Sequence, residues 1–351
     1  MKIEGYLEKA SERGASDLFI IAGLPLTYKI NRKMVQVNEK KLMPDDTRSL
    51  IGEIYSIAQG RSMDILEQTG DDDFSFSIPN MGRFRVSTYS QRGSLAAVIR
   101  LIAFCLPNPE ELGIPSSIMA LSEYRQGLVL ITGAAGSGKS TTLACLIDQI
   151  NTTRQEHIIT LEDPLEFIHR HKKSIVSQRE IRSDTESYKT ALRASLRQSP
   201  DVILLGEMRD YETINIAMTA AETGHLVFST LHTQGAANAV DRIIDVFPAN
   251  QQRQVAIQLA TVLNAVVSQQ LLPDVRGSLV PAFELMTVNR AIKNMIRDNK
   301  VHQIDGLVYS SGQKNMFSMD CFLVKLYANG KISRETALDY ATNPEMIMQK
   351  L

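Results

Sequence analysis

Residues 128–141 read LVLITGAAGSGKST, and this stretch decides the fold. The spacing G-x4-G-K-[ST] of a phosphate-binding loop is met here by Gly133, Gly138, Lys139 and Ser140. The apolar run before the loop is typical of a buried strand, and residues 141–150 after it are typical of a helix. Strand, glycine-rich turn and helix in that order are the context in which this motif binds a nucleotide, which predicts an α/β domain.

Glycines in such a loop let backbone N–H groups point at phosphate oxygens, and the start of the following helix adds a favourable potential for an anion. Lys139 is expected to reach the β- and γ-phosphates of ATP, and the Ser140 hydroxyl is expected to ligate Mg²⁺. The full set of expected nucleotide-binding residues is Gly133, Gly136, Ser137, Gly138, Lys139, Ser140 and Thr141. The alternative interpretation is a glycine-rich turn that binds no nucleotide.

Short continuous apolar runs recur along the rest of the chain, separated by enough sequence for a helix. They cover residues 128–131, 158–161, 202–205 and 226–228. Strands that are apolar on both faces and joined by helical crossovers indicate a mainly parallel sheet covered on both sides. A helix is predicted over residues 250–272, because apolar side chains there recur at helical spacing: Val255, Leu259, Val262, Val266 and Leu271. Three further short helices are predicted after it.

The first hundred residues show a mixture of short helices and strands. Helices are predicted over 2–13 and 45–68, and strands over 18–22, 74–78 and 83–89, with a turn at 79–82. Three prolines between 106 and 115 indicate a linker, although an ordinary loop within one domain is the alternative. We therefore expect a smaller α+β domain at 1–105, a linker at 106–115 and an α/β domain at 116–351.

Carboxylates follow two of the predicted strands directly. Glu207 stands where a carboxylate usually supports Mg²⁺ or its water shell. Glu162, Asp163 and Glu166 follow another strand, and they repel one another unless a cation or a proton-transfer role offsets the repulsion. Because ligands gather at the carboxyl ends of parallel strands, one of the three is a candidate base that orients an attacking water. Solvated acids are the alternative interpretation.

Histidines bracket the predicted strand at 226–228. His232 follows the strand and is expected to face the γ-phosphate, whereas His225 precedes it, on the far side of the sheet if the strand is straight. His169 and His171 lie in a basic stretch, and we interpret them as a solvated surface rather than a metal site.

Bulk composition argues against several classes of protein. The 351 residues carry a formal net charge of −1, which argues against a nucleic-acid coat or a membrane-surface binder. The three cysteines form no CxxC pair, which argues against a disulfide framework or a cysteine-rich zinc site and favours a reducing cytoplasm. The polar N-terminus lacks the apolar stretch of a signal peptide, and no apolar run reaches the ~18 residues of a membrane span. We expect no nucleic-acid partner and no membrane insertion.

Four motifs in this order resemble those of the secretion and pilus ATPases of type II and type IV systems. GAAGSGKS is similar to their Walker A motif. The other three are similar to their Asp box, Walker B motif and His box: IITLEDPLEFIH (158–169), DVILLGEMRD (201–210) and TAAETGHLVFSTLHT (219–233). The N-terminal sequences GASDL (14–18) and GRFRV (82–86) extend the resemblance over most of the chain.

Within this group the chain most resembles the type IV pilus retraction ATPase (PilT) family. It is short, it lacks the four-cysteine zinc motif usual in the assembly ATPases, and residues 291–298, AIKNMIRD, are similar to the retraction signature AIRNLIRE. A plain amphipathic helix is the alternative interpretation of that last stretch.

The resemblance implies a homohexameric ring in which each subunit has a PAS-like N-terminal domain and a RecA-like P-loop ATPase domain. It implies that Glu166 is the catalytic glutamate, that Glu207 acts on Mg²⁺ and that His232 senses the γ-phosphate, while His225 supports the subunit core or interface. N-terminal arginines of the family reach the nucleotide across domains, and the candidates here are Arg83, Arg85, Arg92 and Arg100.

Two N-terminal positions depart from the family pattern. Phe19 stands where the family usually has His, and residues 29–33 replace a glycine-containing turn. The resemblance therefore assigns no role to these positions.

The implied function is an ATP hydrolase that turns an inner-membrane platform protein from the cytoplasmic face, so that pilin subunits are withdrawn. A pilus assembly or type II secretion ATPase shares the chemistry and is the nearest alternative. A DNA-translocating RecA-type ATPase is another, against which the net charge and the lack of a basic–aromatic stripe argue. A nucleotide-dependent scaffold that barely hydrolyses ATP is the last.

Overall fold

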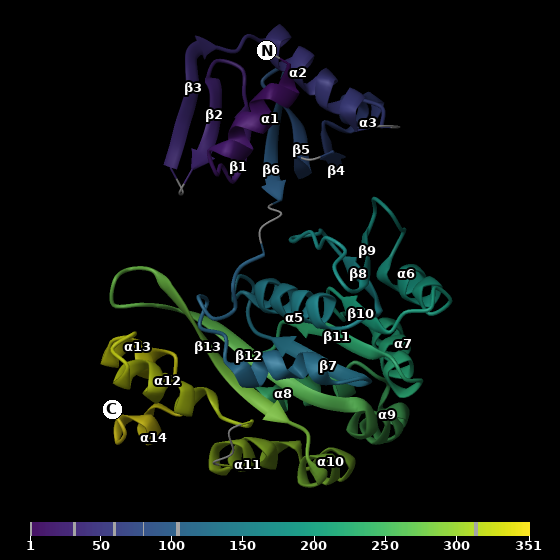
Figure 1. Cartoon of the computed structure of the whole chain (residues 1–351), viewed down its shortest axis with the longest axis vertical. Helices are drawn as coiled ribbons and strands as arrows, with labels where there is room; N and C mark the ends of the chain where they lie inside the picture. The colour runs from purple at the N-terminus through teal and green to yellow at the C-terminus, as the bar shows by residue number, and fades with distance from the viewer. Residues whose placement is uncertain (1, 31–32, 59–60, 80, 103–105, 312–314) are drawn as a thin grey trace. The chain divides into compact units, whose positions relative to one another are not determined.

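The computed structural model describes residues 2–30, 33–58, 61–79, 81–102, 106–311 and 315–351, and Figure 1 shows their helices and strands. Two compact units divide the chain. The first comprises Met1–Cys105 and Glu166–Ile168, and the second comprises Leu106–Leu165 and His169–Leu351. Residues 106–115, the expected linker, contain turns but no helix or strand.

A six-stranded antiparallel sheet forms the first unit, in the order β3-β2-β1-β6-β5-β4. Its strands are β1 (Asp17–Ile20), β2 (Pro25–Ile30), β3 (Lys33–Lys41), β4 (Asp71–Ile78), β5 (Gly82–Gln91) and β6 (Ser94–Ile102). Helices α1 (Ile3–Glu12), α2 (Pro44–Ile57) and α3 (Asp64–Thr69) share one core with alternate strand residues such as Phe84 and Val86. This is the α+β arrangement that the family resemblance implies, with one sheet face covered.

The predicted single helix over residues 45–68 is wrong, because α2 and α3 are separate helices. Arg61, just before α3, donates to the buried carboxylate of Asp72 on β4. This long-range ion pair connects the residues just before α3 to β4, a contact that the helical periodicity of the stretch does not predict.

Seven strands form the sheet of the second unit, in the order β13-β12-β7-β11-β10-β8-β9. They are β7 (Gly127–Thr132), β8 (His157–Glu162), β9 (Ile175–Glu180), β10 (Val202–Leu205), β11 (Leu226–Leu231), β12 (Leu263–Pro273) and β13 (Leu279–Thr287). Neighbours pair in parallel except β12 and β13, which are antiparallel. Every residue of β7, β10 and β11 is buried, as expected for strands with both faces covered.

Helices cover both faces of this sheet. One face packs on α4 (Ser116–Met119), the 3-10 helix η1 (Ala120–Glu123) and α5 (Lys139–Thr153). The other packs on α6 (Tyr188–Ser195), α7 (Tyr211–Glu222), α8 (Ala236–Asp245) and α9 (Ala249–Val262). Successive β7 residues alternate between the two cores, with Leu128 and Leu130 in one and Val129 and Ile131 in the other. The predicted fold class, a mainly parallel α/β domain with a smaller α+β domain, is confirmed.

The predicted helix over residues 250–272 is only half right. Helix α9 ends at Val262, and residues from Leu263 onward form strand β12, which lies between β7 and β13. Val266 and Val267 are both fully buried, one in each core. The apolar side chains within residues 263–272 match both a helical spacing and a strand with both faces buried. The strand forms because the backbone of these residues pairs with β7 in the sheet, a contact that the sequence pattern does not show.

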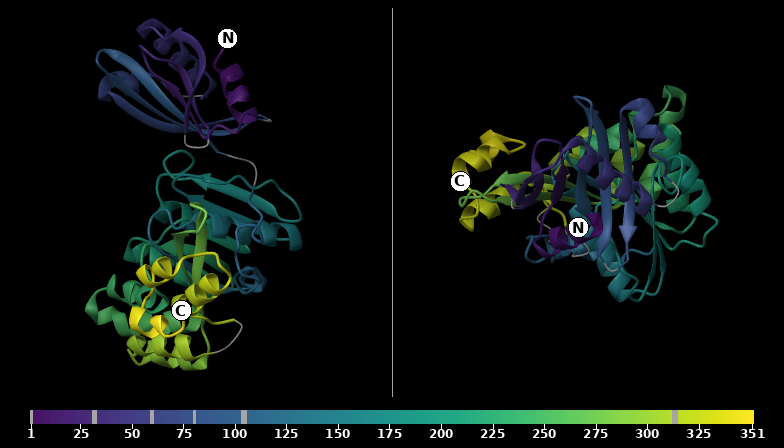
Figure 2. Two further views of the ribbon diagram at one scale, coloured as in Figure 1. Left: turned by 90° about the vertical axis from the view of Figure 1, so that its left-hand side faces the viewer. Right: turned by 90° about the horizontal axis from the view of Figure 1, so that it is seen from above.

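More short helices follow β13 than the three predicted. Within residues 290–311 and 315–351 the structure has α10 (Arg290–Arg297), the 3-10 helix η2 (Val301–Gln303), α11 (Ile304–Ser310), α12 (Met319–Ala328), α13 (Arg334–Asp339) and α14 (Pro344–Met348). Figure 2 shows α12, α13 and α14 in yellow as a small helical group. They share a core that includes Leu323 with Leu272 of β12 and Ala282 of β13. Among all the helices that the structure describes, none is long and apolar enough to cross a membrane.

Candidate nucleotide-binding site

The glycine-rich loop connects the carboxyl end of β7 to the first turn of α5, as predicted. Gly133, Gly136 and Gly138 all have positive φ angles, of 143°, 78° and 88°, which favour glycine over residues with a Cβ. Gly138 is the N-cap of α5, so the loop delivers the positive end of the helix dipole. A Cβ on Gly133 would stand 2.2 Å from a backbone oxygen and 2.7 Å from Ser137 Oγ, so that position has no room for one.

Lys139 curls back over the loop that it follows. Its ammonium group donates to the carbonyl oxygens of Gly133 at 2.8 Å and Ala134 at 2.9 Å, and the residue is 8% exposed. Ser140 and Thr141 lie half-buried in the first turn of α5. The seven predicted nucleotide-binding residues therefore form one continuous cradle.

The chemistry of the cradle fits a phosphate anion. Ser137 Oγ is buried there and has no hydrogen-bond partner among the described residues, so a donor is left for a ligand oxygen. Backbone N–H groups at the start of α5 suit a phosphate. The Ser140 hydroxyl and the Glu207 carboxylate are hard oxygen ligands of the kind that Mg²⁺ prefers.

Glu207 follows β10 directly, on the edge of the sheet to which the loop belongs. It is largely buried, and its two carboxylate oxygens have different partners. Oε1 accepts from Arg209 Nη2 at 2.7 Å, and Oε2 lies 3.3 Å from His232 Nε2. The structure thus brings Glu207 and His232 into contact. The sequence predicted only that each follows a strand of the same sheet. Arg209 was missed, although it stands two residues from Glu207 in the same motif.

His225 lies at the other end of β11 from His232. The strand between them, Leu226–Leu231, is fully buried and spans about 20 Å at the rise of ~3.3 Å per residue. The His225 ring Nδ1 lies 2.9 Å from the carbonyl oxygen of Ala220, near the end of α7. A buried strand therefore separates His225 from the phosphate edge of its own subunit, and its place among the catalytic candidates stays a prediction. Its position at the end of α7 agrees with the supporting role that the resemblance implies.

The acidic segment after β8 divides into two environments. Glu162 is the last residue of β8 and is half-buried, whereas Asp163 and Glu166 are exposed. Tyr188, on α6, was not singled out by sequence reasoning. Burial raises the pKa of its hydroxyl, and the nearby charges of Glu207, Asp163 and Glu162 raise the pKa further. The tyrosine therefore stays protonated beside the acidic edge.

The interpretation of His169 as solvated is wrong. His169 is only 7% exposed, its backbone N–H donates to Gln178 Oε1 at 2.7 Å, and its ring Nδ1 has no partner among the described residues. Burial lowers the pKa of the imidazole to about 4. His171 is exposed, as interpreted, and its Nδ1 accepts from the Val176 N–H at 3.0 Å. Within the described residues no group of three His, Cys, Asp or Glu side chains is placed to hold a metal ion.

The candidate arginines of the first unit fall into two places. Arg83 and Arg85 lie two residues apart on β5, and Arg100 on β6 pairs in register with Arg85, so the three share one sheet face. Arg100 Nε donates to Asp17 Oδ1 at 3.0 Å. Arg92 lies in the turn after β5, about 23 Å along the strand from Arg85 at ~3.3 Å per residue. One ligand contacting the first three therefore does not also contact Arg92 in the same subunit.

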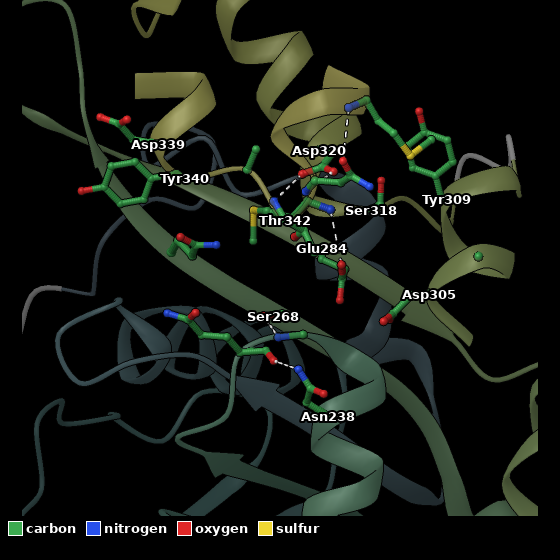
Figure 3. Close-up of a pocket in the computed structure, with 18 residues that line it drawn as sticks. Asn238, Ser268, Glu284, Asp305, Tyr309, Ser318, Asp320, Asp339, Tyr340 and Thr342 are labelled. Atoms are coloured by element: carbon green, nitrogen blue, oxygen red, sulfur yellow. Dashed lines mark hydrogen bonds between the residues drawn. The ribbon is translucent and has the colours of Figure 1, made fainter. Parts of the chain in front are cut away.

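A separate cavity of about 740 Å³ lies between α8 and the C-terminal helices (Figure 3). Its polar lining includes Asn238, Ser268, Glu284 and Asp320, and none of the predicted nucleotide-binding residues belongs to it. Glu284 is buried and accepts from the Ala236 N–H at 2.7 Å, and Ser268 Oγ accepts from the Gly235 N–H at 3.0 Å. These contacts hold the start of α8, which begins four residues after His232.

Comparison with known proteins agrees with this geometry. The model of the Type II/IV secretion system protein family matches residues 2–279. The chain is 43% identical over 345 residues to the type IV pilus retraction ATPase PilT of Pseudomonas aeruginosa, covering 98% of this chain and 99% of that protein. It is 43% identical over 318 residues to a twitching motility protein of Neisseria gonorrhoeae, covering 90% and 84% respectively.

Among solved structures, the crystal structure of the pilus retraction motor PilT with bound ADP matches with a TM-score of 0.90 and 44% identity over 99% of each chain. Sequence, motifs and fold thus agree over nearly the whole length. The chain belongs to the Type II/IV secretion system protein family, and within it to the pilus retraction ATPases.

Proposed function

We propose that this chain hydrolyses ATP to drive the retraction of type IV pili, and hence twitching motility. One observation carries the proposal. The glycine-rich cradle at the end of β7 and the Glu207 carboxylate just after β10 lie on one edge of a mainly parallel sheet with helices on both faces. Full-length similarity to proteins named as retraction ATPases supports the same conclusion.

The residues of the site divide the chemistry between them. The loop N–H groups and Lys139 bind the phosphates of ATP. Ser140 and Glu207 hold Mg²⁺, which neutralises phosphate charge. Glu166 orients and deprotonates the attacking water, and His232 senses the γ-phosphate through its contact with Glu207. Arg209 and His232 contact the two oxygens of the Glu207 carboxylate and so hold its orientation for this role.

The working form in this proposal is a homohexamer of subunits with domains at 1–105 and 116–351 joined by residues 106–115. Arginines of the N-terminal domain supply positive charge to the transferring phosphate. Arg83, Arg85 and Arg100 share a sheet face, which supports their acting as a group, while Arg92 lies apart from them in the turn after β5. The ring works at the cytoplasmic face of the inner membrane on a platform protein of the pilus machine.

The enzymatic part of the proposal is tested with purified variants. Lys139→Ala and Glu166→Gln should each lower ATP turnover at least ~100-fold while the protein stays folded, since each removes a group that acts on the phosphate or the water. Glu335→Gln, an exposed change on α13, is the matched control and should retain wild-type turnover. Hydrolysis near the wild-type rate by both site variants would contradict the assignment.

The direction of the motor is tested in cells of the source organism. Deleting the gene should leave cells with more surface pili and no twitching, because assembly continues without retraction. Wild-type protein should restore motility and the Lys139→Ala variant should not. Cells with fewer pili would instead identify an assembly or secretion ATPase.

A further inference from the structure

Gln269 of β12 is a buried polar residue that the proposed site does not yet use. It is 3% exposed and lies on the strand next to β7. Its side-chain Oε1 accepts a hydrogen bond from the Thr142 hydroxyl in the first turns of α5, at 2.8 Å. A buried amide costs free energy unless it is hydrogen-bonded, so a glutamine here needs a reason that an apolar residue of equal size does not.

Gln269 also contacts both glycines that delimit the phosphate-binding loop. Its backbone oxygen stands 2.2 Å from the place where a Cβ on Gly133 would lie. Its side-chain Nε2 stands 2.8 Å from the corresponding place on Gly138. One residue thus touches the start of the loop, the end of the loop and the helix that follows it.

The strand that carries Gln269 is a rigid support. β12 pairs with β7 on one side and with β13 on the other, and both Val266 and Val267 just before Gln269 are fully buried. The loop, by contrast, exposes Ala134, Ala135 and Gly136. A contact from a fixed strand to both ends of a glycine-rich loop limits the conformations that the free loop adopts, and preorganisation of this kind strengthens ligand binding.

We propose that Gln269 is a positioning residue for nucleotide binding, which holds Gly133, Gly138 and Thr142 at the spacing that a phosphate group requires. The inference rests on the proposed function, because it assumes that the loop binds a nucleotide. Gln269 acts through the loop and does not itself touch the reacting atoms.

Gln269→Glu tests the role with almost no change of shape. The carboxylate still accepts from Thr142, but the amide N–H₂ beside Gly138 is lost and a negative charge is placed next to an anion site. We expect the Kd for a fluorescent ADP analogue to rise at least tenfold at about pH 8, which corresponds to about 1.4 kcal/mol. Relative to wild type, affinity should recover as the pH is lowered and the carboxyl group becomes neutral.

Two further variants separate positioning from mere stability. Gln269→Leu should raise the Kd by about the same factor without recovery at low pH, since it has no titratable group. Thr142→Val removes the hydroxyl from the other side and should also weaken ADP binding. In steady-state assays the KM for ATP should rise more than kcat falls. Gln270→Glu, the neighbour on the same strand, is the matched control and should bind like wild type.

The outcomes distinguish this inference from the proposed function. If Lys139→Ala loses ADP binding but both Gln269 variants bind ADP like wild type at each pH, Gln269 has no positioning role and the nucleotide site stands. If the Gln269 variants only melt at lower temperature, with unchanged Kd and KM when folded, the role is structural and the inference fails. If Lys139→Ala binds ADP as tightly as wild type, the nucleotide site itself is misassigned.

Discussion

The buried imidazole of His169 predicts that the second unit loses stability in mild acid. The folded protein holds this group neutral, because burial lowers its pKa to about 4; the smaller effect of Asp148 raises the pKa, and that of Lys172 lowers it. In the unfolded chain a histidine titrates near its ordinary pKa of about 6.5. Between these two values the unfolded state binds a proton that the folded state does not, so stability rises with pH and falls as the pH is lowered.

The size of the effect follows from the difference in pKa. Each pH unit in this window is worth about 1.4 kcal/mol, so lowering the pH from about 7.5 to about 5 costs about 2 kcal/mol from His169 alone. A His169→Leu variant removes the titrating group and keeps an uncharged side chain at this buried position. The His169 ring Nδ1 has no hydrogen-bond partner among the described residues, so the substitution breaks no hydrogen bond at that atom. The variant should therefore lose about 2 kcal/mol less than wild type over the same pH interval.

Urea denaturation followed by circular dichroism at the two pH values measures this difference. His302→Gln, a change at an exposed histidine, is the control and should keep the wild-type dependence on pH. His171 is a poorer control, since its ring accepts a backbone hydrogen bond that protonation would break. Equal pH dependence in wild type and His169→Leu would refute the reasoning and would mean that the imidazole is solvated or charged in the folded protein.

Two other predictions concern the acidic edge of the sheet. His232→Ala should lower kcat roughly tenfold or more, since it removes a partner of Glu207. His225→Ala should leave turnover unchanged and lower the free energy of unfolding by about 1 kcal/mol, because it removes the contact with the Ala220 carbonyl oxygen. Equal loss of turnover in both variants would contradict their placement at opposite ends of β11. Gly206→Ala should lower ATP turnover, because its Cβ would stand 2.8 Å from the Tyr188 hydroxyl and 3.2 Å from the Leu161 carbonyl oxygen. Adding Tyr188→Phe should restore part of that loss, and a double variant no better than the single one would show that the tyrosine is not the obstacle.

Local patterns were sufficient wherever one stretch of chain carries the whole signal. The phosphate-binding loop is such a case, because its glycines, lysine and serine all lie within eight residues and the strand and helix flank them directly. The covered parallel sheet is another, since strands buried on both faces leave continuous apolar runs. Glu207 was found for the same reason, as the first carboxylate after such a run.

Predictions failed where a residue's environment comes from distant parts of the chain. Residues 263–273 continue the apolar spacing of α9, yet they form β12, because β7 and β13 offer ladder partners on both sides. His169 lies in a basic stretch of sequence but is buried by the fold. The helical pattern of 45–68 likewise predicted one helix where the structure has two, and Arg61 between them pairs with the distant Asp72.

By itself, the sequence determined that this protein binds phosphate, that its core is a parallel sheet and that it resembles retraction ATPases, because each of these is written in contiguous motifs. Only the tertiary structure decided which side chains meet. It joined Glu207 to Arg209 and His232, separated His225 from them by a buried strand, and brought Gln269 against a loop more than a hundred residues earlier in the chain. Such contacts depend on strand order, and no spacing along one stretch of sequence encodes the order in which strands assemble.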